Sequence, residues 1–286
     1  MIKGPETPYG AHHQSLDEIL VAFGRIGGPT EHGWHTLEPM FSCWRLHNFK
    51  KNATSNGHTS KALAVGSILH EFLAIYYAPH IIDLASRPKI AGSVDSLYNH
   101  IKQTEYSEEA DEAKRLLDAY LSYYEGRDGY LSKSVEIVGI EVPLQRTLPW
   151  GAPYTVRLDM VLKLPDGYWA VDHKTTWAKT TEFVEGWQVD PGIIGAMWAA
   201  SETFSPLRGA SINGVIKTKV PEFDRFTFAF DEGITADWQR MLEYKMAEQP
   251  LARLAGWPPN FKACFGKWGR CGYFERCVYG VGADQP

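Results

Sequence analysis

The chain has 286 residues, of which 44% are hydrophobic and 22% are charged, a composition typical of a soluble globular protein with one large domain or two modest ones. The sequence shows neither a signal-peptide nor a transit-peptide pattern, and no apolar run approaches the ~18 residues that span a bilayer. We therefore expect a soluble cytoplasmic protein with no membrane association. The net charge of −5 would argue against a nucleic-acid partner only if the charges were evenly spread.

The first half of the chain has the apolar spacing of helices. This spacing occurs in "LDEILVAFGRI", in "KALAVGSILHEFLAIYYA" and in "SEEADEAKRLLDAYLSYYEGR", the last of which opens with acidic residues that the helix dipole favours. Within the second segment, Gly66 and His70 stand four residues apart and share one helix face. The glycine permits another backbone to approach closely, and the imidazole can bind a metal ion, although a single helical histidine is more often an ordinary polar residue.

From Ser134 the pattern changes to strands. The segments "SVEIVGIEVPLQRTL", "YTVRLDMVLKL" and "YWAVDHKT" are rich in β-branched and aromatic residues, and "PDG" supplies a turn between the second and the third. A helical "DPGIIGAMWAASETF" follows, then the strands "ASINGVIKTK" and "DRFTFAF", and a helix from Asp231 to about Glu248. These elements predict an α/β (α+β) fold in which a mixed sheet of about five strands is flanked by helices.

The hairpin formed by the second and third strands predicts a cluster of charged side chains. If residues 166–167 form a two-residue Asp-Gly turn, Asp159 faces Lys174 and Val161 faces Asp172, so the two aspartates and the lysine share one face of the sheet. Two carboxylates that close repel each other unless a cation lies between them, and Mg²⁺ or Mn²⁺ suits oxygen ligands. The lysine can help to activate a water for phosphodiester cleavage. A structural Asp–Lys pair is the alternative interpretation.

Four cysteines occur at two places in the chain. Cys43 stands alone, whereas Cys264, Cys271 and Cys277 lie near the end and are separated by six and five residues. A cytosolic protein is expected to keep them reduced, and four thiolates suit a zinc ion or an iron–sulfur cluster. Structural zinc usually takes a shorter cysteine pair, so these spacings favour the larger cluster, with four unrelated buried cysteines as the alternative.

Basic charge is concentrated around these cysteines. Residues 39–70 and 249–274 contain eight of the 29 Lys and Arg residues and none of the 34 Asp and Glu residues. Aromatic residues crowd the same windows: Trp44, Phe49, Trp257, Phe261, Phe265, Trp268, Tyr273 and Phe274. Basic groups between aromatic surfaces suit a groove for single-stranded nucleic acid, whereas the simpler interpretation is a solvated basic face over a small aromatic core.

In this order, the elements resemble the PD-(D/E)xK nuclease superfamily, in its RecB-like iron–sulfur branch, which includes CRISPR-adaptation exonucleases, the AddB nuclease domain and phage exonucleases. "GSILH" resembles the GxxxH element, "VRLDMV" the motif that supplies an aspartate, and "VDHKTT" the D-x-K element. The resemblance implies that His70, Asp159 and Asp172 bind a divalent metal together with the main-chain carbonyl of His173. It also implies that Lys174 is the catalytic lysine.

The same resemblance covers the chain from Cys43 to Cys277 and implies a 4Fe-4S cluster, with zinc as the alternative. It implies three regions: a helical N-terminal region (1–133) that contributes Cys43 and His70, a nuclease core (134–248), and a cysteine-rich tail (249–286) that packs against the first region. The tail departs from the pattern of this branch, because its first cysteine gap of six residues exceeds the usual two.

A second departure concerns the contact with DNA. The family commonly has a Q-x-x-x-Y element on the helix after the D-x-K strand, but Gly192 and Ala196 occupy those positions here. Gln188 lies one turn earlier and could substitute for the missing glutamine. Glu141 stands where relatives often carry a glutamate, and we expect it at most to assist the metal ligands. Further candidates for contact with the DNA backbone lie in the tail: Lys262, Lys267 and Arg270.

The sequence thus predicts a metal-dependent DNA exonuclease, of phage or prokaryotic type, that acts in recombination, DNA end processing or CRISPR adaptation, with a protein partner in such a pathway. One alternative is a DNA-binding or decoy protein that retains a nuclease fold but does not need its chemistry. Another is a zinc-stabilised interaction protein. Cleavage polarity, strand preference, exonuclease against endonuclease action and oligomeric state do not follow from the sequence.

Overall fold

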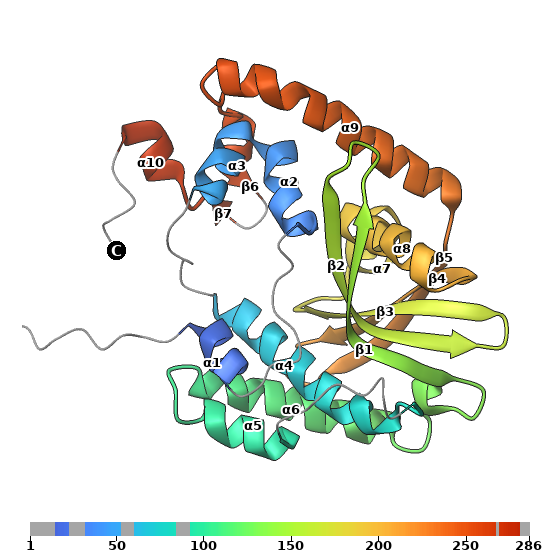
Figure 1. The fold of residues 1–286 in the computed structure, drawn as a ribbon. Helices are drawn as coiled ribbons and strands as arrows, with labels where there is room; N and C mark the ends of the chain where they lie inside the picture. Colours follow the sequence, from blue (N-terminus) through green and yellow to red (C-terminus); the bar gives the residue numbers. More distant parts are fainter. Residues whose placement is uncertain (1–14, 23–31, 53–59, 84–91, 267–268, 281–286) are drawn as a thin grey trace, which may run out of the picture.

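The computed structural model describes residues 15–22, 32–52, 60–83, 92–266 and 269–280. A mixed sheet of five strands lies at the centre of these residues (Figure 1). Its strands lie side by side in chain order: β1 (Glu136–Thr147), β2 (Pro153–Leu164), β3 (Gly167–Thr176), β4 (Leu207–Ile216) and β5 (Glu222–Ala229). β3 and β4 run parallel, and the other neighbours run antiparallel. The predicted five-stranded mixed sheet is thus confirmed.

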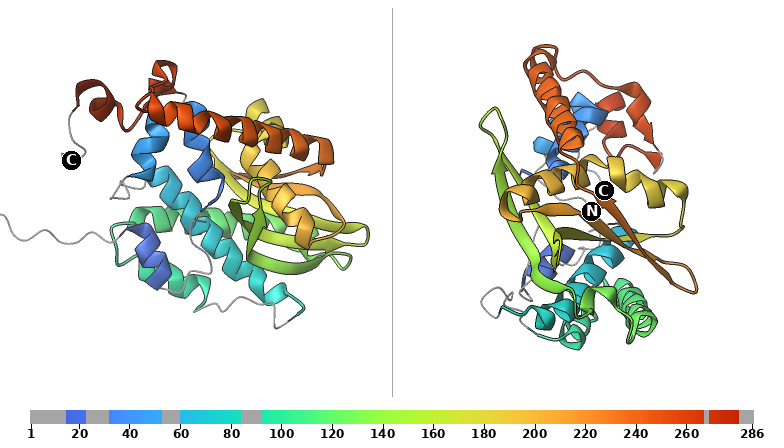
Figure 2. Two further views of the ribbon diagram at one scale, coloured as in Figure 1. Left: turned by 45° about the horizontal axis from the view of Figure 1, so that its top comes forward. Right: turned by 90° about the vertical axis from the view of Figure 1, so that its right-hand side faces the viewer.

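Helices cover both faces of this sheet (Figures 1 and 2). On one face, α4 (Lys61–Tyr77) and α6 (Ser107–Tyr124) share a large apolar core with residues from each of the five strands. On the other face, α8 (Pro191–Thr203) packs against the strands, and α9 (Glu232–Leu254) packs on α8 through Trp198 and Trp238. Two shorter helices complete the first layer: α1 (Leu16–Ala22) and α5 (Val94–Ile101).

The α4 helix is a long, largely apolar helix of the first layer. Together with the following turn η1 (Ala78–His80) it is the one helix in the described part of the chain that is long and apolar enough to cross a membrane. However, 56% of that stretch is buried inside the protein, where Ile68, Leu69 and Phe72 pack in the core. The burial is that of the core helix of a globular domain, because its apolar face already has protein neighbours.

The hairpin between β2 and β3 differs from the prediction. Leu164 pairs with Gly167, so the turn residues are 165–166 and the glycine begins β3. A Cβ at this glycine, whose φ is +146°, would lie 2.5 Å from the carbonyl oxygen of Pro206, so a contact with the segment before β4 fixes glycine inside the strand. The predicted Asp-Gly turn is therefore wrong, and each β3 residue faces a β2 residue two positions earlier than expected. Because the shift is even, the paired residues of the two strands keep the faces expected for them. Asp159, beyond the last pair, lies on the α4 side beside His70 and not on the face of Asp172 and Lys174.

The parallel pair β3–β4 requires a crossover on one face of the sheet. The chain makes it through α7 (Thr181–Glu185), the 3-10 turn η4 (Gly186–Val189) and α8. Asp190 begins α8 by accepting a hydrogen bond from the backbone N–H of Ile193 at 2.9 Å. The crossover thereby places η4 and the first turn of α8 beside the end of β3.

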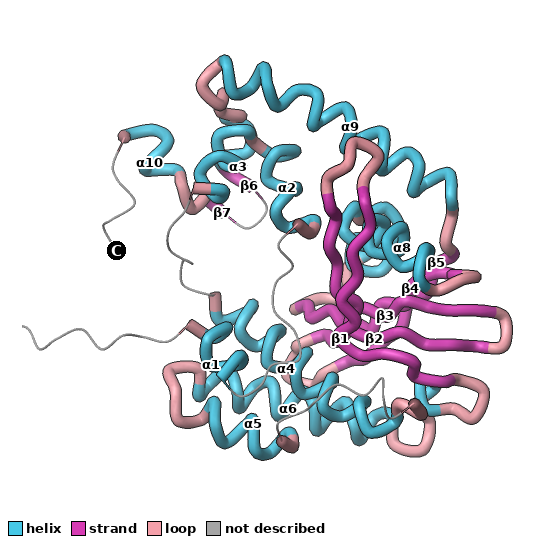
Figure 3. The backbone as a smooth tube through the Cα atoms, viewed as in Figure 1, coloured by secondary structure: helices cyan, strands magenta, loops and turns pink. Residues whose placement is uncertain are grey.

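A separate lobe forms where the N-terminal helices meet the C-terminal tail (Figures 1 and 3). It contains two helices, α2 (Trp34–Ser42) and α3 (Trp44–Lys51), and the tail elements η5 (Phe261–Cys264), β6 (Phe265–Gly266), β7 (Gly269–Arg270) and α10 (Phe274–Tyr279). Arg45 Nε donates to the carbonyl oxygen of Trp257 at 3.2 Å, and the rings of Phe49 and Tyr273 lie 5.4 Å apart. We call residues 34–51, 257–266 and 269–280 the cysteine lobe.

Candidate active site

The end of β3 carries the charged residues that the sequence singles out. Ala170 packs on the α8 side of the sheet and Val171 on the α4 side. Because side chains alternate along a strand, Asp172 and Lys174 continue the α8 side and His173 continues the α4 side. Lys174 Nζ lies 2.5 Å from Asp172 Oδ2, and the two side chains are 31% and 27% exposed. The predicted pair is therefore an ion pair between partly exposed side chains, in which Asp172 Oδ2 itself is buried.

The α4 helix and β2 bring two more groups to this point. His70 Nδ1 lies 3.4 Å from Asp159 Oδ2, and the backbone N–H of His173 donates to the same oxygen at 2.6 Å. One turn before His70, a Cβ on Gly66 would lie 3.2 Å from Thr175 Oγ1. The glycine thus permits the close approach of α4 to β3 that the sequence predicts, and this approach lets the imidazole reach Asp159.

Glu141 lies nearer to these groups than its predicted assisting role implies. It stands across from Asp159, between the residue pairs 140–160 and 142–158 of the β1–β2 ladder. Its φ of 51° is a strained value for a residue with a side chain, of the kind that clusters at functional sites. Arg157 Nε lies 3.3 Å from its Oε2. Burial, followed by the Asp159 charge, raises the pKa of Glu141 to about 8.

The charges of the cluster depend on one another. Burial by itself lowers the pKa of His70, but the Asp159 carboxylate outweighs it and the pKa rises to about 9. Burial would raise the pKa of Asp159, but the imidazolium holds it well below its usual range. Burial also raises the pKa of Asp172, despite the ammonium of Lys174 beside it. Burial would lower the pKa of Lys174, but the two aspartates raise it, so the lysine stays charged. Each of the three carboxylates, Glu141 included, has one cationic neighbour, yet burial still raises the pKa of Glu141 and of Asp172.

The donor set fits a hard divalent cation by its chemistry. Imidazole nitrogen and carboxylate oxygens from His70, Asp159 and Asp172 are ligands that Mg²⁺ and Mn²⁺ accept. The raised pKa of Glu141 marks a place where a further positive charge would be favourable. Within the described residues, however, no three His, Cys, Asp or Glu side chains are gathered closely enough to hold a metal ion as they stand. Asp172 is instead turned to Lys174, and Asp159 to His70.

Two cavities adjoin at these residues. The larger, of about 730 Å³, is lined by His70, Glu141, Asp159 and His173, whereas the smaller, of about 330 Å³, is lined by Asp172. Five residues line both: Trp34, Val156, Arg157, Lys174 and Gly192. The cation of Lys174 therefore lies between two hollows, one toward α4 and the other toward α8.

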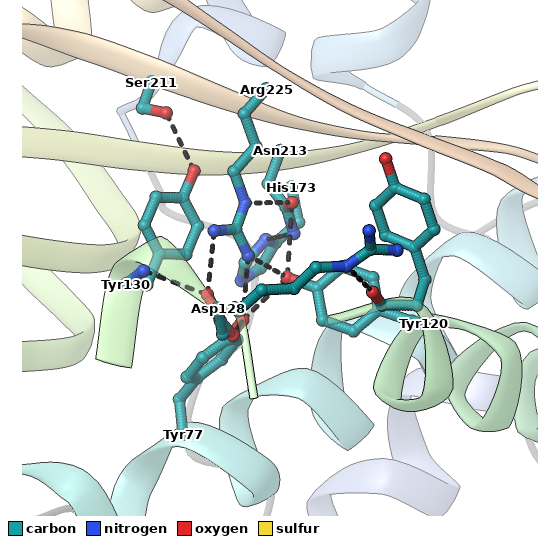
Figure 4. A network of polar contacts seen from close by, with 10 residues as sticks. Tyr77, Tyr120, Asp128, Tyr130, His173, Ser211, Asn213 and Arg225 are labelled. Carbon is teal, nitrogen blue, oxygen red and sulfur yellow. Dashed lines mark hydrogen bonds and ion pairs between the residues drawn. The ribbon is translucent and has the colours of Figure 1, made fainter. Parts of the chain in front are cut away.

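A buried polar network lies behind His173 (Figure 4). Arg225 of β5 donates to Asp128 Oδ1 and to Tyr120 Oη, both at 2.8 Å, and to Asn213 Oδ1 at 3.3 Å. Asn213 Nδ2 donates in turn to His173 Nδ1 at 2.8 Å, so the imidazole proton is on Nε2. Burial lowers the pKa of His173 to about 3, which keeps the ring neutral. The network therefore fixes the middle residue of the D-x-K segment from the α4 side.

The four cysteines line one small cavity in the cysteine lobe, of about 20 Å³, together with apolar, amide and Arg45 side chains but no acidic ones. The backbone N–H of Asn260 donates to Cys43 Sγ at 3.3 Å, and Arg45 Nη1 lies 3.6 Å from Cys277 Sγ. Burial, followed by the other three cysteines, raises the pKa of the Cys264 thiol. N–H donors in a place without carboxylates can stabilise thiolates, but as they stand no three of these cysteines are close enough together to hold a metal ion. Cys271 is the fourth residue of the set.

The predicted DNA contacts have mixed surroundings. Gln188 is exposed on η4, beside Trp187, which lines the smaller cavity. Lys262 is exposed on η5. Arg270 is also exposed, but it already pairs with Glu275 at 2.7 Å, so it is not free to meet a phosphate without exchanging a partner. Lys267 lies outside the described residues.

Several residues at the site were not predicted from the sequence. Arg157 stands in the quoted "VRLDMV" and could have been noted as the basic neighbour of Asp159. No local sequence pattern identifies Trp34 and Trp187 as site residues, because they lie far apart in the sequence and only the crossover brings them together. Asn213 and Arg225 face each other across β4 and β5, a pairing that requires the strand order.

Comparisons with known proteins bear on the fold alone. No family model matches the chain, and no curated protein matches it. Among solved structures, the chain is similar to the crystal structure of a protein from Eubacterium rectale named "Putative exonuclease", with a TM-score of 0.51 at 17% sequence identity, over 96% of this chain and 90% of that chain. A second structure, known by a locus name alone, gives a TM-score of 0.31 at 11% identity over 75% of this chain and 86% of that one, which carries no argument. The first likeness shows that the two proteins share a fold.

Proposed function

We propose that this protein is a metal-dependent DNA nuclease of the PD-(D/E)xK type that acts on strand ends. The observation that carries the proposal is the convergence of His70 from α4, Asp159 from β2 and the Asp172–Lys174 pair from β3 on one pair of adjoining cavities. The fold shared with the Eubacterium rectale protein, whose name includes exonuclease, supports the same class of activity.

The proposed roles follow from the chemistry of each group. His70, Asp159, Asp172 and the main-chain carbonyl of His173 would hold Mg²⁺ or Mn²⁺. When bound, the cation would supply Lewis-acid stabilisation of the phosphate and would favour an ionised water. Lys174, held by Asp172, would orient that water and offset the charge that develops on the phosphate.

We further propose that Cys43, Cys264, Cys271 and Cys277 hold a 4Fe-4S cluster. Their arrangement around one cavity supports a shared metal group, and the N–H donors to Cys43 and Cys277 would stabilise thiolates. The group would join the N-terminal helices to the tail and so build the basic, aromatic lobe beside the site. A single zinc ion is the alternative, and iron and acid-labile sulfide analysis of anaerobically purified protein separates the two.

The function is tested with end-labelled single-stranded and double-stranded DNA, with Mn²⁺ or with EDTA. The parent protein should release labelled nucleotides only with the metal. Asp172→Ala should abolish release, whereas Asp166→Ala, a control in the exposed turn of the same hairpin, should cleave like the parent. If the parent binds DNA tightly but does not cleave it, the protein is instead a DNA-binding protein that does not need its chemistry. The absence of Gln and Tyr at the Q-x-x-x-Y positions, where Gly192 and Ala196 stand, is compatible with that role. Equal cleavage by parent and Asp172→Ala would refute the assignment.

A further inference from the structure

The smaller cavity, on the α8 side of β3, extends well beyond the two residues of the proposed chemistry that line it, Asp172 and Lys174. Its volume of about 330 Å³ is near the lower end of the ~300–1,000 Å³ range for small-molecule pockets. Two indole rings line it, Trp34 from α2 and Trp187 from η4. Apolar side chains form part of the remaining wall, and charged side chains form much of the rest; the apolar ones include Val156, Leu158, Ile193, Met197 and Ala210. A cavity with this size and lining suits one flat ring system.

Two small residues of α8 keep the cavity open. Gly192 and Ala196 both line it. A Cβ at Gly192 would lie 3.2 Å from Cδ1 of Trp34 and 3.1 Å from Asp190 Oδ1, so a longer side chain here would push on the indole. These are the two positions where the resembled family commonly carries Gln and Tyr. The space that those side chains would fill is here a hollow between aromatic walls.

The polar groups of the cavity favour a neutral ligand over a phosphate. Glu38, Asp172 and Asp190 all line it, and its two cations are already paired, Lys174 with Asp172 and Arg157 with Glu141 on β1. The three carboxylates would therefore repel a phosphate inside the cavity. They can accept hydrogen bonds from the N–H groups of a neutral ring.

Resting on the proposed nuclease function, we infer that this cavity receives one unpaired nucleobase of the substrate strand. The base would stack against Trp187 and Trp34 while the adjoining phosphodiester lies outside the cavity, at its border with the larger one, where Lys174 lines both. Taking a base out of a stack requires least free energy where it is already single-stranded or at a frayed end. The cavity thus specifies a substrate class: single-stranded DNA and frayed duplex ends.

The test removes one base at a time. A fluorescent single-stranded oligonucleotide is compared with copies that carry a tetrahydrofuran abasic residue at successive positions from the end, and affinity is measured by anisotropy in EDTA. The parent should lose about 5- to 150-fold in affinity at one such position, as loss of base–aromatic stacking predicts. Ala196→Leu, which fills the cavity, should bind the intact strand as weakly as the parent binds this abasic strand. The variant should also bind the intact and the abasic strand with equal affinity.

Two further variants and a cleavage assay keep the inference separate from folding and from the proposed function. Ala236→Leu changes an alanine that is also half-buried, on α9 outside the cavity, and should bind like the parent. Trp187→Phe keeps a ring and should retain base discrimination, but with lower affinity. Full discrimination by Ala196→Leu, or a parent indifferent to base removal at every position, would overturn the inference. Discrimination by a parent that does not cleave with Mn²⁺ would instead refute the nuclease proposal and leave the base pocket standing.

Discussion

Lys174 is held by Asp172, whose Oδ2 lies 2.5 Å from the lysine Nζ. In the proposed site the ammonium acts on the water and the phosphate, whereas the carboxylate binds the cation. Lys174→Ala should therefore slow single-turnover cleavage about 100-fold or more, and leave Mn²⁺ affinity within a few-fold of the parent. Cleavage rates and Mn²⁺ titrations measure both, with Lys163→Ala, on the exposed part of β2, as the control. Matched losses of rate and affinity would indicate a structural lysine instead.

His70 makes the stability of the metal-free protein depend on pH. Its pKa rises from 6.5 to about 9 on folding, because Asp159 outweighs the effect of burial. The stabilisation is therefore fully present below pH 6.5 and is lost as the pH rises through 9. With a side chain 28% exposed, we expect a loss of about 2 kcal/mol in the free energy of unfolding over that window. Urea unfolding in EDTA at pH 6 and pH 9.5 measures it, and an equal loss in His70→Gln would contradict this origin.

Site residues that belong to a sequence motif could be predicted from the sequence, whereas site residues outside any motif could not. His70, Asp159, Asp172 and Lys174 stand at spacings that strand and helix periods convert into neighbours. The strained backbone of Glu141 and the hydrogen bond from Asn213 to His173 depend on strands that pair across long separations. No local pattern contains that information.

The network that joins β5 to α6 and β3 is an element-scale feature. The Arg225 side chain is 15% exposed and its partner Asp128 is 5% exposed. Arg225→Met should lower the free energy of unfolding by about 3–5 kcal/mol, because it leaves a buried carboxylate without its cation. The double variant Asp128→Asn, Arg225→Met should recover part of that loss. Urea denaturation measures both, and the control Arg240→Met, 66% exposed on α9, should change little. A loss below 1 kcal/mol for Arg225→Met would show that the network contributes little to stability.

Helices and strands could be predicted where the local spacing of apolar residues determines them. They were misplaced where a contact with a distant segment determines the backbone conformation. The helix that carries His70 and the five strands follow from apolar spacing. The Asp-Gly turn did not form, because Gly167 is needed within β3 against the carbonyl of Pro206. The even shift of register keeps Asp172 and Lys174 together on the α8 side, but Asp159 lies on the α4 side with His70, so the predicted single face for all three residues is wrong.

At the scale of the whole molecule, the cysteine lobe joins Cys43 to residues 221 positions later. If the four cysteines hold one cluster, Cys43→Ser should lose most of the iron and should make the tail sensitive to protease. DNA affinity should fall with it, because Lys262 would no longer be held in a fixed position on the lobe to meet the DNA backbone. Limited proteolysis with iron analysis is the measurement, and Ser42→Ala, at the neighbouring exposed position, is the control. A tail as protected as in the parent, or protein that holds zinc and no iron, would contradict the cluster.

The class of fold followed from the sequence, but its assembly did not. The order of helices and strands predicts a mixed sheet flanked by helices, whereas the sequential strand order and the meeting of α2 with η4 around one cavity arise from packing between distant segments. The two windows without acidic residues, which also contain the cysteines, indicated that these distant segments share one environment.

The proposed function requires that His70, Asp159, Asp172 and Lys174 form a metal-dependent nuclease site. The most direct measurement is the single-turnover rate of end-labelled DNA cleavage as a function of Mn²⁺ concentration, for the parent and for Asp159→Ala. The parent rate should rise from zero and saturate, whereas the Asp159→Ala rate should stay at least about 100-fold lower at every Mn²⁺ concentration, because the cation loses a carboxylate ligand. Superimposable curves for the two proteins, or cleavage by the parent that is unchanged in EDTA, would contradict the claim.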